Sequence, residues 1–243
     1  MDHVSLPQPV LIEKSGAVLT FTLNNPDAAN EITGPMFDAM IAALRSEAIE
    51  PTARVLRLRA AGNAFCKGRE RAGRDAVSVH AEVTRLIELK KLLRSSSLIS
   101  VAEVQGDAFG FGFGLAILCD FAIVSSAARL AFPEMKAGLP PAAIMAYLGR
   151  YALPKRVFPM VLFGDPMTPS VALEAGLITQ IAEPDTLSVA TDTLIERILA
   201  LNEAGARNCK AFFQAAEENS LEQNFRFATE TLTVTTMRLM QSR

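Results

Sequence analysis

Residues 99 to 141 limit the possible folds of this chain more than any other stretch. An apolar segment, Ile99–Val104, is followed by four spaced glycines and then by an apolar run that ends at Cys119 and Asp120. This order predicts a strand, a glycine-rich turn and the start of a helix. The first N–H groups of a helix have no partner within it, and glycine lets a ligand approach them closely. The stretch therefore predicts a site for a group that carries negative charge.

One carboxylic acid follows this stretch inside an apolar segment. Glu134 lies between the apolar residues 130–132 and Met135. A buried carboxyl group with few charged neighbours has a raised pKa, which suits a residue that takes up and returns protons. Taken alone, a glutamate after Pro133 would more simply be a loop or helix-start carboxylate.

Strand and helix patterns alternate through the first half of the chain. Residues 10–13 and 18–23 predict a hairpin, residues 33–44 an amphipathic helix, and residues 53–59 a strand that leads into the segment AFCKGRE. A helix over residues 80–93 then precedes the central strand. Successive strand, loop and helix units argue for an α/β fold with crossover connections, in which ligands usually bind at the strand ends.

The second half becomes helical. Residues 142–151 predict a helix, whereas residues 153–163 contain two prolines and predict at best a broken one. A short helix and a short strand at 178–182 follow, and everything after 185 predicts helices, the last opened by a capping box of Ser220 and Gln223. We expect an α/β core over 1–184 and a helical region over 185–243. Its helices are apolar on several sides and must be covered by something.

Composition excludes several classes of function. The chain has 243 residues, half of them hydrophobic, so it can bury a large core, and its net charge of −2 gives no electrostatic case for nucleic acid. The longest apolar run, 108–119, is too short to span a membrane. The opening MDHVSLPQPV lacks the basic start and apolar segment of a secretory signal, and three cysteines fit neither a disulfide framework nor a metal site. These features predict a cytoplasmic protein without metal.

Four segments together resemble the enoyl-CoA hydratase/isomerase, or crotonase, family. VQGDAFGFGFGLAILCD (104–120) and AFPEMKAGLPP (131–141) are similar to its central signature. NAFCKGRE (63–70) resembles the family motif A-F-x-x-G-x-D, and the segment from LFGD (162–165) to Leu177 and Ile178 resembles a later motif. They occur in the family's order and spacing and cover most of residues 10–185, which is far more specific than a lone glycine pattern.

The resemblance implies a crotonase-like spiral of repeated ββα units with a C-terminal all-helical trimerisation region. It implies a homotrimer or a dimer of trimers, an acyl-CoA thioester of fatty acid metabolism as substrate, and no separate cofactor, since coenzyme A is part of the substrate.

The resemblance also implies an oxyanion hole. Family members hold the thioester carbonyl oxygen with two backbone N–H groups, which stabilise the enolate that forms beside it. Carried over by position, these are the N–H groups of Arg69 and Phe111. On the residues alone, the alternative for Gly110 and Gly112 is a tight turn between strand and helix.

The acid positions depart from the hydratase pattern. Family hydratases place a water between two glutamates; the second is matched by Glu134, but Gly114 stands at the first. Glu70 and Asp107 are the acids near this gap. One carboxylate can still move a proton between two carbons of an enolisable thioester. The sequence thus favours an enoyl-CoA double-bond isomerase, with a hydratase, lyase or hydrolase of the family, or a non-catalytic acyl-CoA binder, as alternatives.

The sequence predicts the residues that bind the coenzyme A part of the substrate less specifically than it predicts the oxyanion hole. Family members hold the nucleotide against the loop before the first helix and against basic residues near the first motif, whereas Arg69, Arg71 and Arg74 could equally form a solvated face. The residues expected to contact substrate or coenzyme A are Asp27, Ala29, Glu31, Cys66, Lys67, Gly68, Glu70, Phe109, Gly110, Gly112, Gly114 and Pro133.

Overall fold

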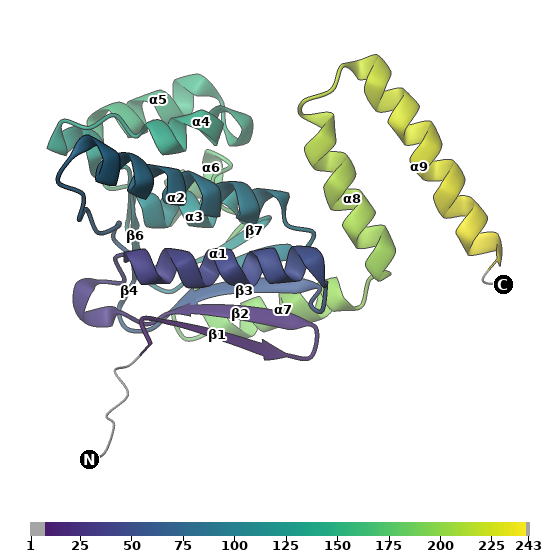
Figure 1. Ribbon diagram of the computed structural model, residues 1–243, viewed down its shortest axis with the longest axis horizontal. Helices are drawn as coiled ribbons and strands as arrows, with labels where there is room; N and C mark the ends of the chain where they lie inside the picture. The colour runs from purple at the N-terminus through teal and green to yellow at the C-terminus, as the bar shows by residue number, and fades with distance from the viewer. Residues whose placement is uncertain (1–7, 242–243) are drawn as a thin grey trace, which may run out of the picture.

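The fold is built on two sheets in a computed structural model that describes residues 8–241 (Figure 1). The expectation about the start of the chain falls mostly on residues 1–7, which lie outside the described residues. The large sheet has the order β1-β2-β3-β5-β7-β9 and the small one the order β4-β6-β8. All neighbouring strands are parallel except the β1-β2 hairpin.

The large sheet confirms the strands expected from the sequence. Its members are β1 (Val10–Ser15), β2 (Val18–Leu23), β3 (Val55–Ala60), β5 (Ile99–Val104), β7 (Phe121–Ser125) and β9 (Gln180–Ala182). β5, in the middle of the sheet, has five buried residues in a row, as a strand covered on both faces should. The sequence analysis does not predict β7, because only Cys119 and Asp120 separate Phe121–Ser125 from the apolar helix before it.

The small sheet was missed altogether. Its strands β4 (Ala64–Cys66), β6 (Asp107–Phe109) and β8 (Leu130–Ala131) have two or three residues each, too few for an alternating pattern. Each follows a strand of the large sheet, so that β3-β4-α2, β5-β6-α3 and β7-β8 repeat the same arrangement. These are the ββα units of the expected spiral.

Helices cover both faces of the large sheet. α1 (Gly34–Ile49), α2 (Ala76–Ser95) and α3 (Phe111–Leu118) belong to the main core on one face, and α7 (Leu187–Leu199) packs through Ile195 and Ile198 on Val55 and Val101 of the other (Figure 1). α3 is buried along its whole length. The glycine turn is thereby held rigidly at the end of β5 and β6.

The prediction of a broken helix over 153–163 was wrong. After α4 (Ala142–Tyr151), α5 (Pro154–Phe163) runs on with Pro159 inside it, and α6 (Pro169–Glu174) follows. Proline 159 and Lys155, whose carbonyl loses its helical partner, are both exposed, so water can take the place of the missing hydrogen bond.

The C-terminal region is helical, as expected. α8 (Glu203–Ala216) and α9 (Leu221–Gln241) form a pair beside the core, with α9 outermost (Figure 1). The rings of Phe212 and Phe227 stack 5.0 Å apart between them. The predicted capping box is present, because Ser220 N donates to Gln223 Oε1 at 2.7 Å and Gln223 N donates to Ser220 Oγ at 3.3 Å. Within residues 8–241, no helix is both long and apolar enough to cross a membrane.

Candidate active site

The first loop of the site follows β4. Ile32 pairs with Arg69 in a parallel bridge, in which Ile32 N donates to Gly68 O and Glu70 N donates to Ile32 O. In such a bridge the N–H of the central residue points away from its partner strand. The N–H of Arg69 therefore points away from Ile32. Gly68 has φ +146°, which an L side chain rarely adopts.

The second loop is the start of α3. Phe111 is its first residue, so the Phe111 N–H has no acceptor within the helix. Gly110 before it has φ +51°, and a Cβ there would lie 2.8 Å from Glu134 Oε1. A Cβ on Gly112 would lie 2.2 Å from the carbonyl oxygen of Cys66. These two glycines are needed so that α3 can approach both Glu134 and the first loop.

One cavity joins the two loops and the glutamate. It has a volume of about 430 Å³ and is mostly apolar. Its lining residues come from α2, α3, α4 and the 3-10 turn Pro133–Ala137. They are Lys67, Gly68, Arg69, Arg71, Val83, Leu86, Lys90, Gly110, Phe111, Pro133, Glu134, Ala137, Leu139, Pro140, Pro141, Ala142, Ala143 and Ile144.

Glu134 is the one carboxylate among these lining residues. Its Oε2 is buried and has no hydrogen-bond partner among the described residues. Burial raises the pKa of Glu134, while its own backbone N–H and the positive charges of Lys90 and Arg71 oppose this rise. A buried carboxylate oxygen without a partner is costly to a fold unless something binds there, which makes it a mark of function.

The sequence interpretation missed two residues beside Gly114. A Cβ at this position would lie 2.6 Å from Tyr147 Oη and 2.9 Å from Lys90 Nζ, so these groups close the gap that glycine leaves. Lys90 is only 5% exposed. A signal existed: Lys90 follows Leu86 by four residues and precedes Leu93 by three, on the apolar stripe of α2.

Several expected contact residues do not line this cavity. Asp27 and Ala29 lie on a neighbouring hollow, to which Lys67 also contributes. Glu31 and Glu70 are exposed, and the side chain of Cys66 is fully buried. The expected residues that line neither hollow are Glu31, Cys66, Glu70, Phe109, Gly112 and Gly114.

The acids suspected beside the Gly114 gap lie elsewhere. Asp107 pairs with Arg129 at 2.6 Å and with Lys67 at 3.2 Å, and these bonds, Arg129 first, hold its pKa below the usual value. Asp107 is thus a structural anion beside Lys67. Both Arg69 and Arg71 line the cavity, and the side chain of Arg69 pairs with Glu82 at 3.5 Å.

Asn30 holds the loop before α1 in place. Its side-chain amide donates to the carbonyl oxygens of Ala61 and Ala64 at 2.8 and 2.7 Å, and its Oδ1 accepts from Asn25 N at 2.8 Å. Ala29 and Asn30 both have positive φ, at 50° and 56°. The buried asparagine fixes this strained loop against the first motif.

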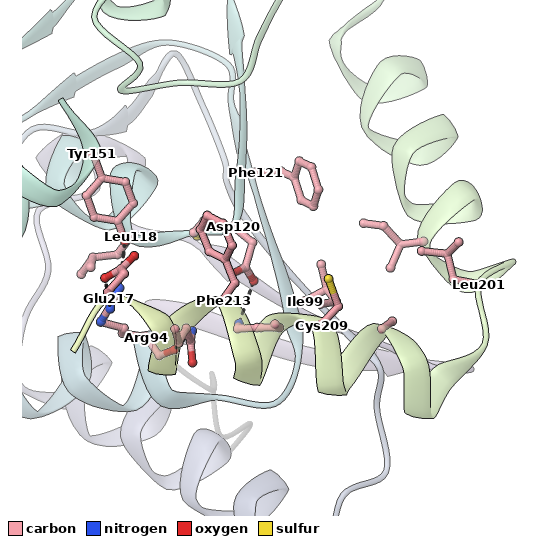
Figure 2. A pocket seen from close by; sticks show the side chains of 15 residues that line it. Arg94, Ile99, Leu118, Asp120, Phe121, Tyr151, Leu201, Cys209, Phe213 and Glu217 are labelled. Atoms are coloured by element: carbon pink, nitrogen blue, oxygen red, sulfur yellow. Dashed lines mark hydrogen bonds and ion pairs between the residues drawn. The ribbon is translucent and has the colours of Figure 1, made fainter. Parts of the chain in front are cut away.

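A second cavity, of about 350 Å³, lies at the base of α8 and is a different kind of feature (Figure 2). Its acid Asp120 accepts from Lys210 Nζ at 2.7 Å and from Ser100 N and Oγ at 2.7 and 2.8 Å. Lys210 also donates to Leu98 O at 2.6 Å. These contacts attach α8 to the core, and none of the three predicted catalytic groups lines this cavity.

Comparisons with known proteins show the family of this chain. The sequence model of the enoyl-CoA hydratase/isomerase family matches residues 13–241. The chain belongs to the enoyl-CoA hydratase/isomerase family. A relative, the mitochondrial enoyl-CoA hydratase domain-containing protein 3 of Xenopus laevis, is 28% identical over 95% of this chain and 80% of its own length.

Solved family structures share the fold. An enoyl-CoA hydratase from Mycobacterium smegmatis matches with a TM-score of 0.90 at 26% identity, covering 95% of this chain and 91% of the other. A Thermobifida fusca family protein solved with CoA has a TM-score of 0.86 at 23% identity, covering 96% of this chain and 95% of that one, which shows the fold alone. Residues 8–241 contain no group of three His, Cys, Asp or Glu side chains suited to a metal ion.

Proposed function

We propose that this family member binds an acyl-CoA thioester, stabilises its enolate with the backbone N–H groups of Arg69 and Phe111, and isomerises enoyl-CoA double bonds with Glu134 as its carboxylate base. The observation that carries the proposal is that Arg69, Phe111 and Glu134 all line one cavity, in which Glu134 is the one carboxylate. Two donors aimed at the thioester oxygen stabilise the charge that develops when a proton leaves C2.

Isomerisation is favoured over hydration because hydration needs a group to activate water and a group to protonate carbon. In the paired-glutamate route both are carboxylates, whereas here Glu134 is the one carboxylate that lines the cavity and Gly114 stands in place of the first. A 3-enoyl thioester needs only that a proton leave C2 and that one reach C4.

One experiment distinguishes the isomerase from the other activities found in the family. Purified protein is incubated with 3-enoyl-CoA, 2-enoyl-CoA and 3-hydroxyacyl-CoA thioesters, and the conjugated enoyl chromophore and free thiol are followed. We expect 3-enoyl-CoA to gain the chromophore and Glu134→Gln to lower the rate by about 10²–10⁴-fold. Loss of chromophore from 2-enoyl-CoA would identify a hydratase, thiol release a hydrolase, and tight binding without turnover a non-catalytic member; each contradicts the isomerase.

For the coenzyme A end we propose Lys67 and Arg71 as phosphate contacts. Lys67 lines both the cavity and the neighbouring hollow that contains Asp27 and Ala29, so an extended ligand could run between the two. Lys67 Nζ lies 3.2 Å from Asp107, which leaves the lysine only partly neutralised. Lys67→Ala should weaken binding of coenzyme A about tenfold, measured by calorimetry, and weaken binding of the dephospho form less.

We also propose that α8 and α9 contribute to a homotrimer or a dimer of trimers. Phe213, Phe225, Leu232, Met237 and Met240 are each more than half exposed in the single chain. Apolar surface of this extent on one helix pair is normally covered. Light scattering of the purified protein tests this, and a monomeric mass contradicts it. The free thiols of Cys66, Cys119 and Cys209 suit a reducing compartment such as the cytoplasm.

A further inference from the structure

Lys90 and Tyr147 occupy the space beside Gly114. They come from α2 and α4, and both functional groups lie within 3 Å of the position that a Cβ on Gly114 would take, Lys90 Nζ at 2.9 Å and Tyr147 Oη at 2.6 Å. The gap in the acid pattern is therefore closed by an amine and a phenol from elsewhere in the chain. An apolar side chain would have filled the same space at lower cost.

This amine and Glu134 flank the start of α3. Gly110 is the N-cap of α3, and Gly114 N donates to Gly110 O at 2.9 Å, so the two glycines lie one turn apart. Glu134 Oε1 lies beside Gly110, and Lys90 Nζ lies beside Gly114. Both side chains line the same cavity. Acyl carbons placed between them would have one titratable group on each side.

Lys90 is held firmly. Its Nζ donates to Tyr147 Oη at 2.8 Å, and Tyr147 Oη donates to the carbonyl oxygen of Gly114 at 2.9 Å. The rings of Tyr147 and Phe111 lie 4.7 and 5.2 Å from Nζ. An ammonium has three donors, and the bond to Tyr147 uses one of them. The others remain available to a bound acyl chain.

We propose that Lys90 is a second catalytic residue, which donates a proton to the far end of the dienolate of a 3-enoyl thioester, with Tyr147 as its positioning residue. The proposal rests on the function proposed above. It assigns proton removal and proton return to two different groups.

The proposed step balances as follows. Glu134 carboxylate takes the proton from C2, and the C–H electron pair enters the dienolate that the Arg69 and Phe111 amides stabilise. The terminal carbon, C4, then forms a C–H bond with a proton from the Lys90 ammonium, which leaves the double bond between C2 and C3. Glu134 releases its proton to solvent, and the neutral Lys90 amine takes one up, so that no net proton is consumed.

A pH dependence follows from the surroundings of Lys90. Burial lowers the pKa of Lys90 to about 7, against the opposing effect of the Glu134 charge. A general acid must be protonated, so the rate should fall as pH rises through about 7. The titratable or charged groups around this corner are Glu134, Arg71, Tyr147, Tyr151 and Cys119, with Arg94 one turn further along α2.

The decisive experiment follows the C2 hydrogen. A 3-enoyl-CoA carrying deuterium at C2 is isomerised in ordinary water, and the product is analysed by mass spectrometry and NMR. If Lys90 supplies the proton, C4 carries hydrogen from solvent and almost no transferred deuterium. Lys90→Met should lower kcat by about 10²–10⁴-fold, with KM little changed, and abolish the fall in rate above pH 7. Its residual product should carry C2 deuterium at C4, returned by Glu134.

Controls separate chemistry from folding. Lys91→Met, at the exposed neighbouring position on α2, should leave rate and label unchanged. Lys90→Ala should regain activity when ethylamine is added, which a purely structural role would not allow. Tyr147→Phe removes the hydroxyl that accepts the hydrogen bond from Lys90. This variant should still turn over substrate, but the pH at which its kcat falls on the alkaline side should shift. Calorimetric binding of a saturated acyl-CoA shows that each variant is folded.

The outcomes are separable. Transfer of deuterium from C2 to C4 in the unaltered protein, or an unchanged rate for Lys90→Met, overturns the role of Lys90 and leaves Glu134 as the sole acid and base. The protein could exchange the C2 hydrogen of a saturated acyl-CoA with solvent but fail to isomerise 3-enoyl-CoA. That result would also reject Lys90 as the proton donor, but it would support the proposed enolate stabilisation by the two amides. Absence of both exchange and isomerisation overturns the proposed function and the role of Lys90 together.

Discussion

Replacing Lys90 by methionine should make the protein more stable while strongly lowering its activity. Methionine is unbranched, of similar length and apolar, so it can occupy the same path through the core. The variant tests whether the fold tolerates an unfavourable amine at this position for the sake of chemistry, since sites of catalysis are often less stable than they could be.

The magnitude follows from the environment of the amine. Burial lowers the pKa of Lys90 from 10.5 to about 7. That difference of about 3.5 corresponds to roughly 5 kcal/mol against the charged form, at 1.36 kcal/mol for each pKa unit. The methionine variant lacks the hydrogen bond to Tyr147 and the attraction of the amine to two aromatic rings. The loss of these contacts should cost the variant roughly 2 kcal/mol of the stability that it gains by removing the charge. The expected net gain near pH 7 is about 2–4 kcal/mol, or a rise in Tm of about 5–10 °C.

The pH dependence of this gain has a definite sign. Between pH 7 and 10.5 the unfolded chain holds a proton on Lys90 that the folded chain lacks, so the unaltered protein gains stability as pH rises. The advantage of Lys90→Met should therefore be largest at or below pH 7 and be lost by pH 10, where the penalty has fallen to about 1 kcal/mol and the lost contacts of roughly 2 kcal/mol outweigh it. Denaturant unfolding of both proteins at pH 6.5 and pH 10 measures it, with Lys91→Met as a control expected to change stability by less than about 0.5 kcal/mol. A variant less stable than the parent at pH 6.5, or an equal difference at both pH values, would refute this reasoning.

Three further predictions concern the framework of the site. Gly112→Ala should destabilise the protein by about 2–3 kcal/mol, because its Cβ would lie 2.2 Å from Cys66 O, whereas Gly149→Ala, with nothing within 4 Å, should be neutral or slightly stabilising; thermal unfolding compares them. Lys210→Met should lower the free energy of unfolding, measured with denaturant, by about 2 kcal/mol, because Asp120 and the carbonyl oxygen of Leu98 both lose the Lys210 amine as hydrogen-bond donor. Limited proteolysis should then cleave this variant near α8 sooner than the parent. Burial raises the pKa of the Cys66 and Cys119 thiols to about 12, so at pH 8 a thiol reagent should modify at most one cysteine, Cys209, in the folded protein and all three after denaturation; rapid reaction of a second thiol contradicts the buried placement.

The sequence alone determined the order of the main elements and the position of Glu134 beside the glycine turn. Ile99–Val104 and Val18–Leu23 are strands as expected, and the glycine turn, the start of α3 and the capping box at Ser220 follow from local patterns. These patterns depend only on residues that are close together in the chain, so the sequence is sufficient to predict these elements. The absence of an acid at Gly114 was also visible.

Only the tertiary structure showed what replaces that acid. Lys90 and Tyr147 lie 24 and 33 residues from Gly114 in the chain, and nothing local relates the three. The two- and three-residue strands of the small sheet were hidden for the same reason, because pairing between distant segments, and no repeating pattern of their own, makes them strands. The chemistry of the site depends on these long-range contacts, since they decide which charged group each buried atom meets.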